Sequence, residues 1–148
     1  MIHTPIQQLP SPSVSRRNPS PSHELRRLVA VFSGGVAGTA GRVLLIDVVP
    51  ESTGVMQWPI FLANILGAFR LGWFVTRGAA SPWRSDLIVP FFAIGLLGSL
   101  TTFSALMVDV VESVRDGLAV GGIGYGLASV FAGLAAAALG MSLAWAKR

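Results

Sequence analysis

The sequence predicts an all-α integral membrane protein with four transmembrane helices. Of its 148 residues, 52% are hydrophobic and only 12% are charged, which is too little charge to cover the surface of a soluble domain. The apolar residues form four continuous runs, and each is long enough to cross a bilayer as a helix, which takes about 20 residues. A transmembrane β-barrel would instead show segments of about ten residues with alternating polarity.

The first 27 residues differ in composition from the rest of the chain. Five Pro and five Ser fall within the first 22 positions, and no apolar run is present. Four Arg lie at positions 16, 17, 26 and 27. We predict a disordered basic tail over residues 1–27 and a four-helix membrane domain over residues 28–148. A cleaved secretory signal is not expected, because the apolar stretch behind the tail is too long for one.

The four predicted spans are separated by short polar connections. The spans are residues 28–46, 58–76, 87–110 and 117–146. The connections are residues 47–57, 77–86 and 111–116, and they hold Pro and Ser residues and five of the six acidic residues of this part of the chain.

The Lys and Arg residues predict the orientation, because cytoplasmic segments retain positive charge. One side of the membrane would receive Arg16, Arg17, Arg26, Arg27, Arg77, Arg84, Lys147 and Arg148. The other side would receive Arg115, with Arg42 near it. Both termini are therefore predicted to be cytoplasmic, in a multi-pass protein of the cell membrane. Since topology accounts for the net charge of +4, no nucleic-acid partner is expected.

Glycines recur at helical spacing within the predicted spans. Such faces let helix backbones approach closely in lipid. The glycines expected to pack in this way are Gly34 and Gly38 on the first span, Gly67 on the second, and Gly126 and Gly133 on the last.

The third span has a weak point at its middle. Gly98, Thr101, Thr102 and Ser104 place glycine, β-branched residues and hydroxyl groups at the expected membrane depth. These residue types destabilise a helix and offer alternative partners to its backbone. The sequence is compatible with a broken helix whose carbonyls face an ion, water or substrate, and equally with an intact helix whose hydroxyls bond back to it.

Polar side chains on the other spans allow two interpretations each. Asn64 lies midway along the second span and could bond a neighbouring helix or a permeating solute. Arg42 near the end of the first span could reach the membrane surface or make a vestibule electropositive. Tyr125 and Ser129, four residues apart, share one face of the last span.

No Asp, Glu or His is predicted near the middle of a span, Asp109 lies at the end of the third span, and the chain has no Cys. Proton-coupled transport and intramembrane catalysis normally need titratable or metal-binding groups at membrane depth. We therefore expect no enzyme and no proton coupling. The functions that remain are passive conduction of an anion or a neutral solute, or a structural role.

Four motifs on successive spans resemble the CrcB/Fluc fluoride channel family. The first span carries Gly-Gly-x-x-Gly-x-x-x-Arg from Gly34 to Arg42, and the second carries Asn-x-x-Gly-x-Phe-x-x-Gly from Asn64 to Gly72. The third carries Gly-x-x-Thr-Thr-Phe-Ser from Gly98 to Ser104, and the fourth carries Tyr125 and Ser129. The order of the motifs and the length of the chain also match the family.

The resemblance implies a pseudo-symmetric dimer of oppositely inserted subunits with two fluoride pathways at the interface. It implies a structural Na⁺ at the dimer centre, bound by the backbone carbonyls of Gly98 and Thr101, and no organic cofactor. It places Asn64, Phe103, Ser104, Tyr125 and Ser129 along the anion pathway, with Arg42 in the vestibule. An aromatic ring edge is electropositive and is therefore a plausible partner of fluoride. The channel would lower cytoplasmic fluoride by passive export.

Three residues depart from the family pattern. Leu106 stands where a second Phe is usual, Gly133 where another hydroxyl is frequent, and Arg70 where an apolar residue is expected. A homodimer of inverted subunits would require nearly balanced flanking charges, whereas this chain is strongly biased. We therefore hypothesise a heterodimer with a homologous chain of opposite orientation that supplies missing pathway residues. A homodimer is the alternative.

Two other functions fit a chain of this size. One is a small four-helix exporter of drugs or organic cations, although its usual membrane carboxylate is missing here. The other is a membrane assembly subunit with no conduction of its own.

Overall fold

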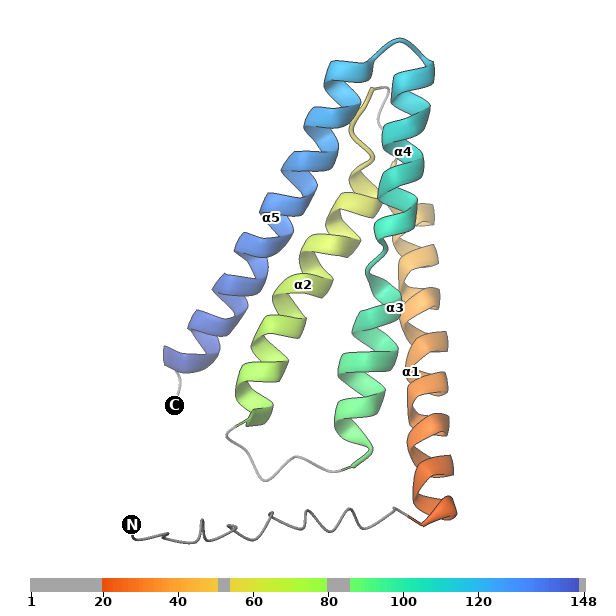
Figure 1. Ribbon diagram of the computed structural model, residues 1–148, viewed down its shortest axis with the longest axis vertical. Coiled ribbons are helices and arrows are strands. Elements are labelled where there is room, and N and C mark those ends of the chain that lie inside the picture. Colours follow the sequence, from red (N-terminus) through yellow and green to blue (C-terminus); the bar gives the residue numbers. More distant parts are fainter. Residues whose placement is uncertain (1–19, 51–53, 80–85, 147–148) are drawn as a thin grey trace, which may run out of the picture.

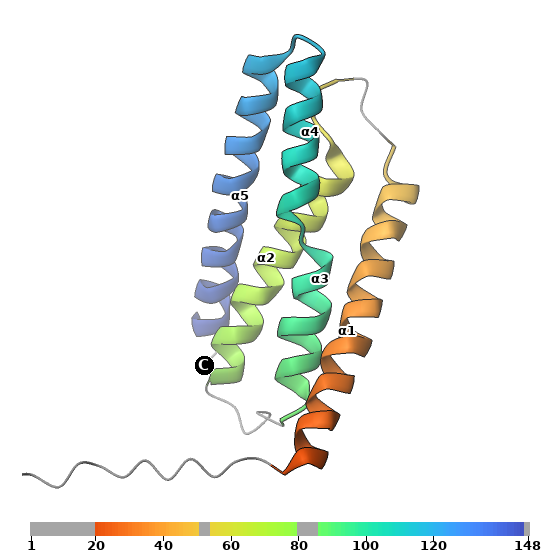
Figure 2. The same ribbon diagram turned by 45° about the vertical axis from the view of Figure 1, so that its right-hand side comes forward.

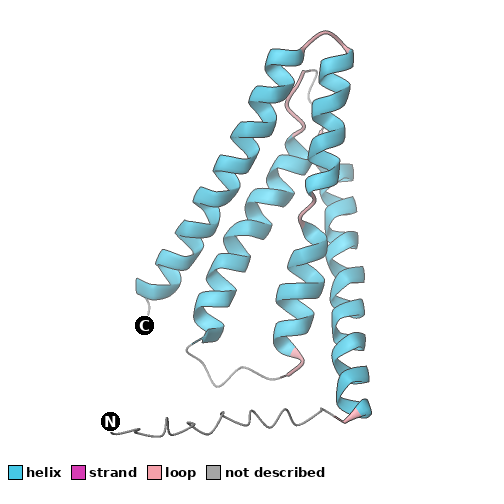
Figure 3. Ribbon diagram, in the orientation of Figure 1, coloured by secondary structure: helices cyan, strands magenta, loops and turns pink. Residues whose placement is uncertain are grey.

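The computed structural model describes residues 20–50, 54–79 and 86–146. These residues form six helical segments and no strand, and Figures 1 and 3 show the bundle that the helices make. The segments are α1 (Pro21–Val48), α2 (Trp58–Ala79), η1 (Pro90–Leu97), α3 (Gly98–Leu100), α4 (Phe103–Arg115) and α5 (Ala119–Ala146). Segments η1, α3 and α4 follow one another along a single span.

The prediction of four membrane-spanning helices is confirmed. Helices long and apolar enough to cross a bilayer cover Pro21–Val48, Trp58–Gly78, Pro90–Arg115 and Ala119–Ala146. Large apolar side chains remain exposed along all of them, as expected for helices whose outer faces meet lipid or another membrane subunit.

Helix α1 begins earlier than predicted, which corrects the boundary of the expected disordered tail. Residues 21–27 are helical, and residues 1–19 lie outside the described part of the chain. Pro21 occupies the first helical position, which suits its fixed φ, and Glu24 lies in the first turn near the positive end of the helix dipole. The Ser20 carbonyl accepts hydrogen bonds from the His23 and Glu24 amides at 2.8 and 3.2 Å.

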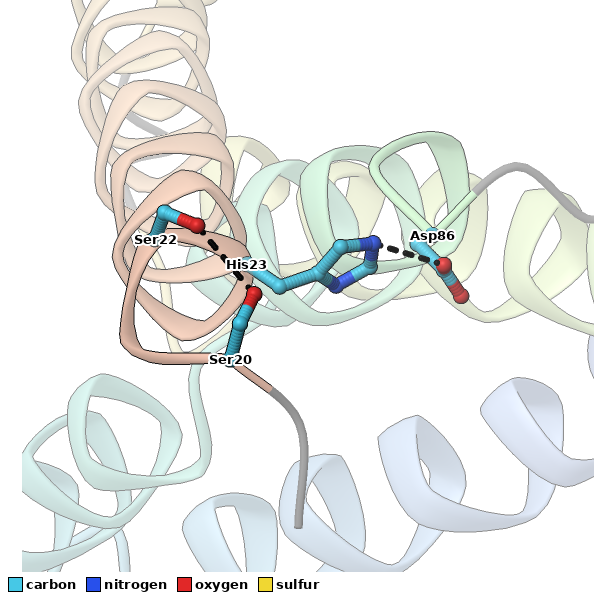
Figure 4. Close-up of polar contacts among 4 residues, drawn as sticks. All are labelled: Ser20, Ser22, His23 and Asp86. Carbon is cyan, nitrogen blue, oxygen red and sulfur yellow. Dashed lines mark hydrogen bonds and ion pairs between the residues drawn. The ribbon is translucent and has the colours of Figure 1, made fainter. Parts of the chain in front are cut away.

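A polar contact joins the start of α1 to the segment before the third span. The Nε2 atom of His23 lies 3.2 Å from Oδ2 of Asp86, and the Ser20 and Ser22 hydroxyls lie 3.1 Å apart, as Figure 4 shows. The beginning of α1 and the end of α5 lie at the same end of the bundle (Figures 1 and 2). For brevity, this end of the bundle is called the basic end, because Arg26, Arg27 and Arg77 lie there.

The third span changes its packing partner along its length. Segments η1 and α3 pack against α1, whereas α4 packs against α5. Between them, Thr101 (φ −80°, ψ 148°) and Thr102 (φ −149°, ψ 119°) have extended backbone conformations, and Figure 3 shows this loop between the two helical parts. The extended pair redirects the chain from one neighbour to the other.

The first glycine face brings α1 and η1 into backbone contact. A Cβ added at Gly34 would collide with the carbonyl oxygen of Phe91, and one added at Gly38 would collide with the carbonyl oxygen of Leu96. On the facing segment, a Cβ at Gly95 would lie 2.9 Å from the Cα of Gly34. Both helices therefore need glycine at this crossing.

Glycines also line other helix contacts, although not every glycine of the spans does so. A Cβ at Gly67 would collide with the Thr101 side chain, and one at Gly126 would lie 3.0 Å from Cγ2 of Val110. A Cβ added at Gly140, on the same helix as Gly126, would collide with the carbonyl oxygen of Phe69. The predicted packing role of Gly133 is wrong within the subunit, because a Cβ there would meet none of the described atoms within 4 Å.

We expect Gly38→Ala to destabilise the protein strongly. The new methyl group would press on backbone, which cannot rotate away, and overpacking of this kind costs about 1–3 kcal/mol. Gly124→Ala is the matched control, because its Cβ has open space around it. Thermal unfolding of the purified assembly in detergent should show a lower Tm for the first variant only. Equal Tm values for both variants would contradict the close crossing.

Candidate functional site at the interrupted third span

The side chain of Asn64 forms hydrogen bonds with the backbone at the interruption of the third span. Its Oδ1 accepts a hydrogen bond of 2.7 Å from the Thr102 amide, and its Nδ2 donates one of 3.1 Å to the Thr102 carbonyl. Both backbone groups of Thr102 thus find a partner on α2 in place of helical partners. Of the two interpretations of Asn64, bonding to a neighbouring helix is what the structure shows. One Nδ2 proton remains free to bind another group.

Thr102 also begins the next helix. Its Oγ1 accepts a hydrogen bond of 3.2 Å from the Ala105 amide, which is an N-cap for α4, and it lies 3.2 Å from the Ser104 hydroxyl. A threonine cap satisfies one of the free amides at a helix start. The Thr-Thr-Phe-Ser sequence therefore encodes an end and a restart of the helix within one span.

The interruption leaves peptide oxygens without helical partners. The Thr102 amide bonds Asn64 and the Ala105 amide bonds the Thr102 side chain, so neither reaches the carbonyl four residues earlier. Among the described residues, no hydrogen bond to the carbonyl oxygen of Gly98 or Thr101 is present. Carbonyl oxygens of this kind are ligands that hard cations accept. The residues present therefore fit the Na⁺ site that the sequence resemblance implies.

A groove of about 530 Å³ lies beside the interruption, between α2, α4 and α5. Asn64, Thr102, Phe103 and Ser129 contribute to its wall, together with Leu106 and Gly133. The Phe103 ring is 66% exposed, whereas Ser129 is only 3% exposed. In the described part of the chain, the buried Ser129 hydroxyl has no hydrogen-bond partner. A buried hydroxyl without a partner is costly and suggests that a ligand or water normally binds it.

Tyr125 is buried on the same helix as Ser129, and its hydroxyl bonds two other segments. It donates to the Gln57 carbonyl at 3.2 Å and lies 3.5 Å from Oδ2 of Asp109. Asp109 lies at the end of the predicted third span, whereas α4 continues six residues further to Arg115. Sequence spacing gave no signal for either partner of Tyr125, because both contacts join distant segments.

Arg42 is half-buried in the last third of α1 and does not contribute to this groove. Ser104 lies in the first turn of α4, with its hydroxyl near that of Thr102. The structure thus brings Asn64, Phe103 and Ser129 into one groove and leaves Arg42 and Tyr125 outside it. The vestibule role of Arg42 stays a prediction.

Fold and site together define a small multi-pass membrane protein in which an asparagine of the second span replaces the helical bonds of a discontinuous third span. The chain matches the CrcB-like proteins, described as camphor resistance (CrcB), over residues 29–141. It belongs to this family.

Several relatives cover most of the chain. A protein of Leifsonia xyli subsp. xyli named fluoride-specific ion channel FluC 2 is 39% identical over 140 residues, which is 88% of this chain and 92% of the relative. FluC 1 of Mycolicibacterium paratuberculosis is 37% identical over 124 residues, covering 82% and 92%. FluC 1 of Mycobacterium bovis is 34% identical over 116 residues, covering 78% and 88%. The residues that match the family model, 29–141, include the third-span motif and the asparagine that pairs with it.

Proposed function

We propose that this protein is a subunit of a fluoride channel that lets cytoplasmic fluoride leave passively. The observation that carries the proposal is the groove beside the interrupted span, where Asn64, Phe103 and the unpaired Ser129 hydroxyl meet. The relatives named fluoride-specific ion channels support it. The same names favour a channel over a drug exporter or an assembly subunit without conduction.

The groove offers the chemistry that a small, strongly hydrated anion needs. A selective pore must replace water around the ion with hydrogen-bond donors and electropositive edges. Asn64 has one free N–H, Ser129 has a hydroxyl without a partner, and the exposed Phe103 ring can present its edge. Arg42, Ser104 and Tyr125 would contribute outside the groove. Passive movement of an anion needs no catalytic group.

We propose that two copies of the interruption meet at the centre of a dimer. The free carbonyls of Gly98 and Thr101 from both subunits would together bind one structural Na⁺, which supplies positive charge where four peptide oxygens converge. The exposure of Gly98 on the single subunit is compatible with such an interface. The ion would stabilise the dimer.

The second subunit is proposed to be a homologous chain of opposite orientation. The basic residues of this chain favour one insertion, with both termini in the cytoplasm. Leu106 is almost fully buried, and the Cβ position of Gly133 is open. Neither residue offers an aromatic edge or a hydroxyl, so the partner would supply these groups.

We expect Phe103→Leu to reduce fluoride flux about ten-fold, because aromatic edge interactions contribute about 0.5–1.5 kcal/mol and leucine retains only the apolar volume. Fluoride efflux from vesicles that hold the complete assembly measures the change.

Phe131→Leu is the matched control for this experiment. Phe131 is 67% exposed on α5, nearly the same as Phe103, and it lies outside the groove. Its substitution should leave flux near that of the parent protein. Equal flux for the Phe103 variant and the control would contradict a role of this ring in conduction.

A further inference from the structure

Arg70 places a positive charge on the exposed face of α2, well inside a membrane span. It precedes the last residue of the helix, Ala79, by nine positions, or about 13 Å at 1.5 Å per residue. Within the described residues, no hydrogen bond or ion pair to Arg70 is present. A cation at this depth is costly unless an anion or a polar surface compensates it.

Arg70 lies in an apolar groove of about 700 Å³ where α2 runs between η1 and α5. Its walls include the aromatic rings of Phe69, Trp73 and Phe92, and the aliphatic side chains of Leu96 and Leu143. The volume is within the range of ligand pockets in proteins. The groove therefore combines one cationic group with a long apolar surface.

Arg70 lies on a face of α2 that continues to the basic end of the bundle. Arg70, Trp73 and Arg77 follow one another at helical spacing on one face of α2. The Arg77 guanidinium lies 5.8 Å from the centre of the Trp73 ring. This face thus leads from the groove toward the membrane surface, with an aromatic side chain between two arginines. Trp and Arg in this arrangement are typical of the lipid headgroup region.

The chain supplies little negative charge at this end. Among the described residues, the acidic side chains here are Glu24 and Asp86, and Asp86 already contacts His23 (Figure 4). Asp47, Asp109 and Glu112 belong to the opposite ends of their helices. An anion that pairs with Arg70 would therefore come from outside the subunit.

We propose that the Arg70 groove binds an anionic phospholipid from the leaflet at the basic end. The lipid phosphate contacts the Arg70 guanidinium, and an acyl chain lies against Phe92 and Leu96. A lipid supplies both the anion and the apolar body that the groove fits, whereas a bare anion would leave the aromatic walls unused. Basic residues near a membrane surface attract anionic lipids. The inference depends on the membrane spans and not on fluoride conduction.

Trp73 provides a reporter inside the groove. A variant in which Trp58, Trp83 and Trp145 are replaced by Phe keeps Trp73 as the single tryptophan. The complete assembly is placed in phosphatidylcholine vesicles that contain either brominated phosphatidylglycerol or brominated phosphatidylcholine, and Trp73 quenching is measured against the mole fraction of brominated lipid. We expect the anionic lipid to quench at a mole fraction about five-fold lower.

Substitution of Arg70 separates specific binding from general contact with lipid. Arg70→Leu should abolish the preference for the anionic lipid, and Arg70→Lys should retain part of it. Arg115→Leu, at the other end of the bundle, is the control and should keep the full preference. The proposal is overturned by equal quenching with both lipids or by an unchanged preference in Arg70→Leu. It is also overturned by quenching with neither lipid, which would mean that a protein subunit covers the groove.

Discussion

Asn64→Asp should reduce fluoride flux by about 100-fold. The carboxylate can still accept a hydrogen bond from the Thr102 amide, but it cannot donate one to the Thr102 carbonyl. It also places negative charge beside the groove. Each unsatisfied buried polar group costs about 1–3 kcal/mol, and about 3 kcal/mol corresponds to two decades. Fluoride efflux from vesicles that contain the assembly measures the effect.

Two further variants locate the cause of this loss. Asn64→Leu removes both hydrogen bonds without adding charge, so it should lower both flux and Tm. Ser142→Ala is the control, because the Ser142 hydroxyl donates to the Leu139 carbonyl of its own helix, at 2.9 Å. If Asn64→Asp conducted as well as the Ser142 control, Asn64 would have only a packing role and the proposed pathway would be wrong.

Expression of this chain alone should fail to protect fluoride-sensitive cells. Its flanking charges favour a single orientation, so an inverted pair could not form from one chain. Expression together with a homologous four-helix chain of opposite charge bias should restore growth. The two chains would insert in opposite orientations and could then form the inverted pair. Growth across a series of fluoride concentrations measures the rescue.

The homologous chain expressed by itself is the control for this experiment. It should also fail to protect, since it would lack the residues that this chain contributes. Full protection by either chain alone, with membrane levels equal to those in the paired cells, would contradict the heterodimer and favour a homodimer.

Sequence patterns predicted the spans well because apolar length alone determines them. The predicted second span begins at the same residue as α2, and the last predicted span differs from α5 by two residues at its start. The boundaries were least accurate where charge and helix propensity disagree. Residues 21–27 are helical although two of them are Arg, and α4 extends through Asp109 and Glu112 to Arg115. Charged residues at a membrane surface are compatible with a continuing helix.

The candidate site was predictable only in its residue types. Glycine and threonine marked the weak point of the third span, but nothing in the local sequence indicates that Asn64, 38 residues earlier, bonds both backbone groups of Thr102. The same holds for the contact of Tyr125 with Gln57, 68 residues away. Such pairings depend on how the helices pack.

Glycine spacing predicted close packing without specifying the neighbour. It was correct for Gly34 and Gly38, whose partner is the backbone of η1, and it was wrong for Gly133, which shares a helix with well-packed glycines. A glycine on the same helix can equally lie at a groove, where the missing side chain leaves open space. Only the position of the neighbouring helices separates the two cases.

Fluoride efflux from sealed vesicles that contain this chain and its homologous partner tests the central claim most directly. Vesicles are loaded with potassium fluoride or potassium chloride, and efflux is started by a potassium ionophore. We expect rapid loss of fluoride, no loss of chloride, and slow fluoride loss when the assembly carries Asn64→Asp. Vesicles that retain fluoride with both chains correctly inserted, or that lose both anions at the same rate, would contradict the proposal that the groove at the interrupted third span conducts fluoride.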